Sequence, residues 1–106
     1  MTKLSKPTKP KKINKSALKR KADALFSLKV RSRGLCERCG KSGRAVQLQC
    51  AHVVTRSNLH LRYDPQNALC LCAGCHLYWH KEPLAIISWF KGIYSDRADY
   101  LLREKN

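Results

Sequence analysis

The sequence contains two cysteine pairs of the form C-x-x-C, Cys36 with Cys39 and Cys72 with Cys75. Two such pairs supply the four thiolates that a tetrahedral Zn²⁺ binds in structural sites. Binding of a structural zinc contributes roughly 10–16 kcal/mol to folding, which outweighs what a thin apolar core supplies. The spacing therefore predicts one structural Zn²⁺ that holds a small fold together.

The chain carries a large excess of positive charge, with 22 Lys and Arg against 7 Asp and Glu among 106 residues. This imbalance indicates a polyanionic partner. No apolar run has the length of a membrane-spanning helix, so we expect no membrane partner. Six cysteines without an export signal favour metal binding over disulfides and predict a cytoplasmic protein.

Two histidines, His76 and His80, follow the second cysteine pair. If residues 73–82 form a helix, side chains four apart lie on one face, about one turn from each other. Cys75 precedes His76 by one residue and therefore points about 100° away from it. The histidines are thus predicted to bind a second, open metal site rather than the structural zinc.

Two other ligand sets are compatible with the cysteine pattern. A zinc-finger-like C₂H₂ site is disfavoured because the gap between its cysteines and histidines is far too long. Its ligands would be Cys36, Cys39, His76 and His80. Cys70 competes with Cys72, because residues two apart on a strand point the same way. The C-x-x-C spacing favours Cys72, and we expect Cys50 and Cys70 to be buried as small hydrophobic residues.

Periodicity and turn residues predict an α+β fold of short elements. A stripe of Leu18, Ala22, Leu25 and Phe26 is expected to pack in the core. The expected elements are a disordered basic arm at 1–15, a helix capped by Ser16 that runs to about Arg33 and is ended by Gly34, a strand or hairpin within 44–54, a polar loop at 55–66, a strand at 67–71, and helices at 73–82, 84–91 (ended by Gly92) and 95–103 (capped by Ser95).

The order of these motifs resembles the HNH nucleases, with His52, Asn67 and His76 at the positions of the three letters. The flanking C-x-x-C pairs are similar to the zinc-stapled branch of that family. The resemblance implies a ββα-metal core at about 44–82 within a single domain at 16–106, flanked by an N-terminal helix and C-terminal helices. It implies an endonuclease that hydrolyses DNA phosphodiester bonds with a divalent metal.

The resemblance also implies roles for single residues. His52 is the base that takes a proton from water, and nearby cations favour its neutral form. Asn67 supports it, either by holding the loop closed or by orienting the His52 ring. His76 and His80 bind the catalytic metal, which is Mg²⁺, Mn²⁺, Ni²⁺ or Zn²⁺. The family often has a further metal ligand directly before the base, where this chain has Ala51, so water and substrate phosphate are expected to complete the metal shell.

A narrower likeness concerns Leu25-Phe26 and the loop run Arg56-Ser57, His60-Leu61-Arg62-Tyr63 and Asn67. These residues are similar to the phage NinG recombination-protein family. The likeness implies branched recombination intermediates as a substrate and the cytoplasm of a bacterial host as the compartment.

Phosphate contacts are expected from Arg56 and Arg62 in the loop and from Lys19 and Arg20 on the basic face of the N-terminal helix. Binding mainly through phosphates implies little sequence preference and a steep dependence on salt. One alternative is a non-catalytic, zinc-stapled DNA-binding module, which binds DNA in the same way but has no need of His52, and another is an RNA-binding zinc protein. No sequence feature sets the oligomeric state.

Overall fold

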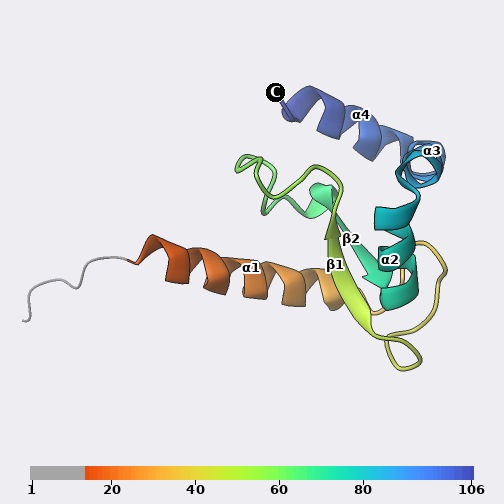
Figure 1. The fold of residues 1–106 in the computed structure, drawn as a ribbon, viewed down its shortest axis with the longest axis horizontal. Helices are drawn as coiled ribbons and strands as arrows, with labels where there is room; N and C mark the ends of the chain where they lie inside the picture. Colours follow the sequence, from red (N-terminus) through yellow and green to blue (C-terminus); the bar gives the residue numbers. More distant parts are fainter. Residues whose placement is uncertain (1–13) are drawn as a thin grey trace, which may run out of the picture.

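The computed structural model describes residues 14–106, which form helices around one two-stranded antiparallel sheet. In chain order the elements are α1 (Lys15–Arg31), β1 (Leu48–His52), the 3-10 helix η1 (Pro65–Asn67), β2 (Ala68–Cys72), α2 (Ala73–Lys81), α3 (Pro83–Ile93) and α4 (Ser95–Glu104). This is the predicted α+β class, a ββα unit with one helix before it and two after it (Figure 1). Over these residues no helix combines the length and apolar composition that a membrane crossing requires.

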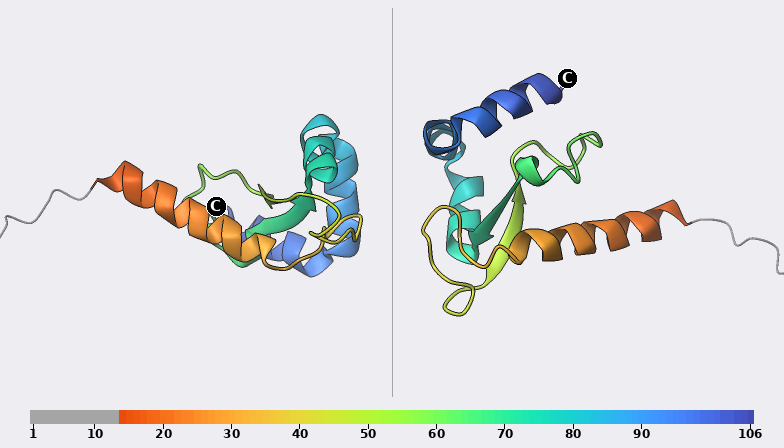
Figure 2. Two further views of the ribbon diagram at one scale, coloured as in Figure 1. Left: turned by 90° about the horizontal axis from the view of Figure 1, so that it is seen from below. Right: turned by 180° about the vertical axis from the view of Figure 1, so that it is seen from behind.

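The sheet is the centre of the fold, and β2 is buried along its whole length. The strands pair antiparallel from Leu48 opposite Cys72 to His52 opposite Ala68. Leu69 and Leu71 pack with residues of α2, α3 and α4, whereas Ala68 and Cys70 pack beneath α1. Figure 2 shows α1 on one side of the sheet and α2 with α3 on the other. Because both faces are covered, the sequence of β2 is apolar at every position instead of alternating.

Helix α1 begins two residues earlier than predicted, because Asn14 and not Ser16 is its N-cap. The side chain of Asn14 accepts a hydrogen bond from the backbone N–H of Ala17 (3.1 Å). Asn14 and Lys15, the last two residues of the expected basic arm, therefore belong to the helix and its cap. The rest of that arm lies outside the described residues. The helix ends at Arg31, and Gly34 follows with a φ of 84°, a value that favours glycine.

The predicted apolar stripe of α1 is wrong for two of its members. Phe26 and Val30 are buried, but Leu18 and Leu25 are 54% and 68% exposed. Successive residues of a helix point about 100° apart, so the face that buries Phe26 turns Leu25 away from the sheet. The first half of α1 also extends past the sheet (Figure 1), which leaves Leu18 without a core to pack on.

Two predicted helix signals near the C-terminus are also wrong. Gly92 lies inside α3, which continues to Ile93. A single glycine costs about 1 kcal/mol in a helix. The packing of the Phe90 ring on that of Tyr94, with centroids 5.7 Å apart, favours the continuation of the helix past this residue. Ser95 is the first residue of α4 and not its cap, because Tyr94 occupies the cap position without a side-chain hydrogen bond.

Asn67 holds the long connection between the strands. Its side chain is fully buried, and its Oδ1 accepts the backbone N–H of Val54 (2.7 Å). Its Nδ2 donates to the carbonyls of Val54 (2.9 Å) and Leu61 (3.1 Å). The connection is thus fixed to the sheet from the inside at two points.

We expect Asn67→Ala to lower the free energy of unfolding by about 3 kcal/mol, because it leaves buried backbone groups of Val54 and Leu61 without partners. Urea denaturation followed by circular dichroism measures the change. Gln66→Ala is the control, because Gln66 is exposed and adjacent. Equal stability of the two variants would show that the three hydrogen bonds do not hold the loop.

Candidate active site

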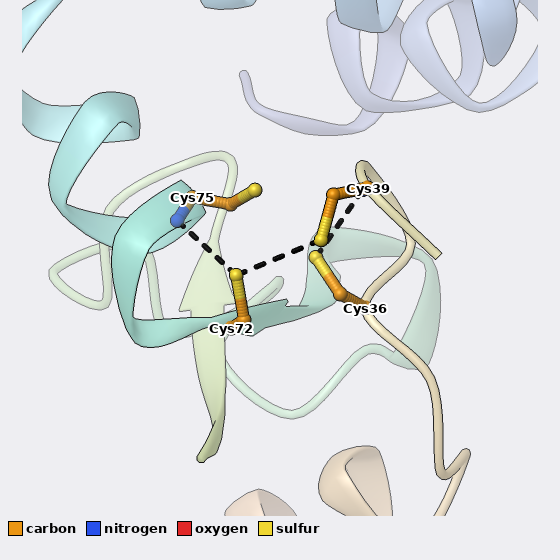
Figure 3. A group of neighbouring side chains, drawn as sticks. All are labelled: Cys36, Cys39, Cys72 and Cys75. Atoms are coloured by element: carbon orange, nitrogen blue, oxygen red, sulfur yellow. Dashed lines mark hydrogen bonds between the residues drawn. The ribbon is translucent and has the colours of Figure 1, made fainter. Parts of the chain in front are cut away.

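The four predicted zinc ligands form one cluster. The sulfur atoms of Cys36, Cys39, Cys72 and Cys75 all lie within 4.8 Å of one another, and the sulfurs of Cys39 and Cys72 are 3.7 Å apart (Figure 3). Zn–S bonds of about 2.3 Å at tetrahedral angles place sulfurs about 3.8 Å apart, so the cluster has the size of such a site. These cysteines can bind a structural metal such as zinc. The alternative C₂H₂ set is wrong, because the four cysteines form the group and the histidines lie outside it.

The local backbone prepares this cluster for thiolates. Gly40 has a φ of 76°, which closes the turn that carries the first pair. The backbone N–H groups of Cys39 and Cys75 donate to the sulfurs of Cys36 and Cys72, each at 3.4 Å. Burial acts to raise the pKa of Cys36, but hydrogen bonds from backbone groups outweigh it and bring the pKa to about 6. Burial raises the pKa of Cys75 to about 12, so full deprotonation of the cluster requires a bound cation.

Cys70 does not compete for the zinc site. It packs with Phe26 and Val30 beneath α1. Cys72 is both the last residue of β2 and the N-cap of α2, and its sulfur belongs to the cluster. Burial raises the pKa of Cys70, and it raises that of Cys50 to about 11, so both thiols stay protonated.

A cleft of about 460 Å³ brings the predicted catalytic histidines together from β1 and α2. Helix α1 forms its third wall. The lining residues are Asp23, Ser27, Cys50, His52, Thr55, Arg56, His76 and His80.

His76 and His80 are arranged as a pair of metal ligands. Their Nε2 atoms are 3.2 Å apart. Two imidazoles bound to one tetrahedral zinc, with Zn–N distances of about 2.0–2.1 Å, have their nitrogens about 3.4 Å apart. Burial lowers the pKa of His76, and the neighbouring His80 lowers it further. Both effects favour the neutral imidazole that a metal requires.

Gln49 orients the His76 ring, a contact that the sequence analysis did not predict. The Nδ1–H of His76 donates to Oε1 of Gln49 (2.7 Å), which leaves Nε2 of His76 free to face His80. Hydrogen bonds of this kind fix the tautomer of metal-binding histidines. The available signal was a glutamine within the β-prone stretch Arg44–Val54, on the strand that carries His52.

His76 and His80 would form an open metal site, because the described residues around them supply no third ligand. Among residues 14–106 the four cysteines are the only group of three or more potential ligands at metal-binding distance. Ala51 offers no ligand, and both carboxylate oxygens of Asp23 accept hydrogen bonds from Arg62. The two histidines would therefore hold a cation such as Zn²⁺, Ni²⁺ or Mn²⁺ and leave positions for water and phosphate oxygens.

His52 lies at the end of β1 with its ring oriented by the backbone. Its Nε2 donates to the carbonyl oxygen of Arg62 (3.0 Å), so Nδ1 is the nitrogen left to accept a proton. Phe26 packs on the ring, with centroids 5.6 Å apart. Burial lowers the pKa of His52 below its ordinary value, which keeps the imidazole neutral near pH 7. Asn67 bonds to Val54 and Leu61, and within residues 14–106 its amide makes no hydrogen bond to the His52 ring.

The predicted phosphate contacts differ in accessibility. The Arg62 side chain is only 12% exposed and is paired with Asp23, so we do not retain it as a phosphate contact. The Arg56 side chain is 59% exposed at the edge of the cleft. Lys19 and Arg20 are exposed on α1.

Comparison with known families agrees with this geometry. Residues 36–82 match the model of the HNH endonuclease family, and they contain all four zinc ligands, His52, Asn67, His76 and His80. The matched segment covers less than half of the chain, and α1, α3 and α4 lie outside it. No curated protein and no solved structure matches the chain. The narrower likeness to NinG stays a prediction.

We expect Cys72→Ser to lose the structural metal and to melt at a lower temperature, because a three-sulfur site binds the cation more weakly. Elemental analysis after gel filtration, together with a thermal melt, measures both effects. Cys50→Ser is the control, because Cys50 lies outside the cluster. Retention of a full equivalent of zinc by Cys72→Ser would contradict the assignment.

Proposed function

We propose that the protein is a metal-dependent HNH endonuclease that hydrolyses DNA phosphodiester bonds. The observation that carries this proposal is that one cleft holds His52, with Nδ1 free, together with the paired Nε2 atoms of His76 and His80. A base that activates water and a cation beside it are the two groups that phosphodiester hydrolysis requires. The HNH family match across residues 36–82 supports a nuclease-type function.

The chain's own residues supply the proton transfer. Nδ1 of His52 takes a proton from a water molecule that attacks the phosphorus atom. The Nε2–H remains on the carbonyl oxygen of Arg62, which stabilises the imidazolium that forms. His76 and His80 would hold the divalent cation, which supplies electrostatic stabilisation of the phosphate and the leaving oxygen. Gln49 keeps His76 in the tautomer with Nε2 free for that cation.

The charge distribution supports DNA as the substrate. The net charge is +15, and Lys19 and Arg20 stand exposed on the helix that forms one wall of the cleft. Arg56 lies at the edge of the same cleft. Such contacts reach phosphates rather than base edges, so we propose cleavage with little sequence preference. The likeness to NinG makes a four-way junction the branched substrate to assay beside linear and nicked DNA.

We expect His52→Ala to reduce nicking of supercoiled plasmid by about 10²–10⁴-fold with Mg²⁺, Mn²⁺, Ni²⁺ or Zn²⁺, because the base is lost. DNA affinity should be unchanged. His60→Ala is the control, because His60 pairs with Glu104 on α4 and does not line the cleft. If wild type and His52→Ala bind DNA equally and neither cuts with any metal, the chain is a non-catalytic, zinc-stapled DNA-binding module.

The rate of cleavage at saturating metal should rise with pH and reach a plateau. The neutral imidazole is the active form of His52, and burial lowers its pKa below the ordinary 6.5. The midpoint of the profile should therefore lie below pH 6.5, with activity lost as the pH falls through that lowered pKa. Single-turnover nicking from about pH 5 to about pH 8 measures the profile. A midpoint above 6.5 would contradict this assignment of the base.

We expect Lys19→Gln and Arg20→Gln each to weaken DNA binding, because each removes a phosphate contact. The slope of log K against log salt should fall in magnitude by about 1 for each variant. Fluorescence anisotropy with a labelled duplex measures it. Lys91→Gln makes the same charge change on α3, away from α1 (Figure 1), and should leave the slope close to that of the wild type.

A further inference from the structure

Helix α1 lies outside the segment that matches the HNH family, yet one of its residues packs on the candidate base and another binds the loop that orients it. Asp23 binds Arg62 through both carboxylate oxygens, with Nε to Oδ1 at 2.8 Å and Nη2 to Oδ2 at 2.5 Å. One turn further along α1, Phe26 packs on the ring of His52 and on that of Tyr63. The helix therefore contacts both the base and the loop that orients it.

Arg62 connects Asp23 with His52. Its backbone carbonyl accepts the Nε2–H of His52, while its side chain is held by Asp23. Its third guanidinium nitrogen, Nη1, donates to the backbone carbonyl oxygen of Arg56 (3.0 Å). Because all of these bonds meet at one residue, the position of the Arg62 carbonyl depends on where the guanidinium is anchored.

The connection that carries Arg62 forms no strand or α-helix of its own, so side-chain contacts must hold it in place. Residues 53–64 lie between β1 and η1, and Asn67 fixes them from the inside through Leu61. Asp23 fixes them from the outside through the next residue, Arg62. The side chains of Asp23 and Arg62 are 22% and 12% exposed, so water and salt weaken their attraction less than at an open surface. A hydrogen bond from Arg62 holds the pKa of Asp23 at about 2, so the pair is ionised at working pH.

We propose that Asp23 and Arg62 form a positioning pair that fixes the carbonyl on which the His52 ring is oriented. The pair keeps the proton on Nε2 and aims Nδ1 into the cleft. Neither residue is assigned a contact with the substrate, because the Asp23 carboxylate is held by Arg62 and by Arg56 (3.8 Å) and the Arg62 guanidinium is held by Asp23. The inference rests on the proposed function and extends it, because it makes α1 a necessary part of an active site that the matched segment alone does not complete.

The kinetic test uses the full chain carrying Asp23→Asn, which keeps the shape of the side chain and removes its charge. We expect the single-turnover rate to fall about 10–100-fold, as for other residues that orient a catalytic group, with the affinity for Mn²⁺ unchanged. The rate is measured at saturating DNA, because Asp23 also lies 3.8 Å from the phosphate-contact candidate Arg56. Glu104→Gln is the matched control, because it removes the charge of the carboxylate that hydrogen-bonds His60 (2.9 Å) in the same loop without reaching His52. In a His52→Ala background Asp23→Asn should cause no further loss of rate, since both changes disable the same base.

The second readout does not depend on cleavage. Nitrogen NMR of ¹⁵N-histidine-labelled protein reports which ring nitrogen of His52 carries the proton. We expect one Nε2–H tautomer in the wild type and in Glu104→Gln, and a mixture in Asp23→Asn. Arg62→Lys keeps the charge but loses the two-point contact, and it serves with the same readouts if Asp23→Asn does not fold.

These readouts separate the two proposals. If no protein cleaves DNA but the tautomer changes in Asp23→Asn, the proposed function fails and the positioning pair stands. If Asp23→Asn folds, cleaves at the wild-type rate and keeps a single tautomer, the positioning pair is overturned and the nuclease is not.

Discussion

The sulfur cluster joins two parts of the chain that are far apart in sequence. It ties the turn after α1 to the junction of β2 and α2. Cys72 is at once the last residue of β2, the N-cap of α2 and a sulfur of the cluster, so one residue sets where the helix starts. That start determines where His76 and His80 stand. The cluster therefore positions the candidate catalytic pair without sharing a ligand with it.

The second requirement is that the loop beside the candidate base, His52, is held in place. The connection between the strands carries the carbonyl that orients His52, yet it has no regular structure until η1. Asn67 binds it from within the core and Asp23 binds it from α1. The two contacts act on adjacent residues, Leu61 and Arg62. A loop held in this way can orient a base as well as a strand does.

Spacing and order predicted most of this arrangement. The C-x-x-C pairs fix which sulfurs meet, and the helical spacing of His76 and His80 fixes their common face. The parts that could not be predicted depend on contacts across the fold. Gln49 and His76 are 27 residues apart, and Asp23 and Arg62 are 39 apart, so no local pattern relates them. The exposure of Leu25 also follows from where α1 meets the sheet, which its periodicity does not encode.

The central claim is that the chain has two separate metal sites, one among four sulfurs and one between two imidazoles facing His52. Anomalous X-ray diffraction from crystals grown with Zn²⁺ and soaked in Mn²⁺, recorded at the edges of both metals, tests it most directly. We expect zinc within the cysteine cluster and a second ion between the Nε2 atoms of His76 and His80, with Nδ1 of His52 facing the same cleft. A single ion bound jointly by cysteines and histidines, or a cleft without any ion at saturating metal, would contradict it.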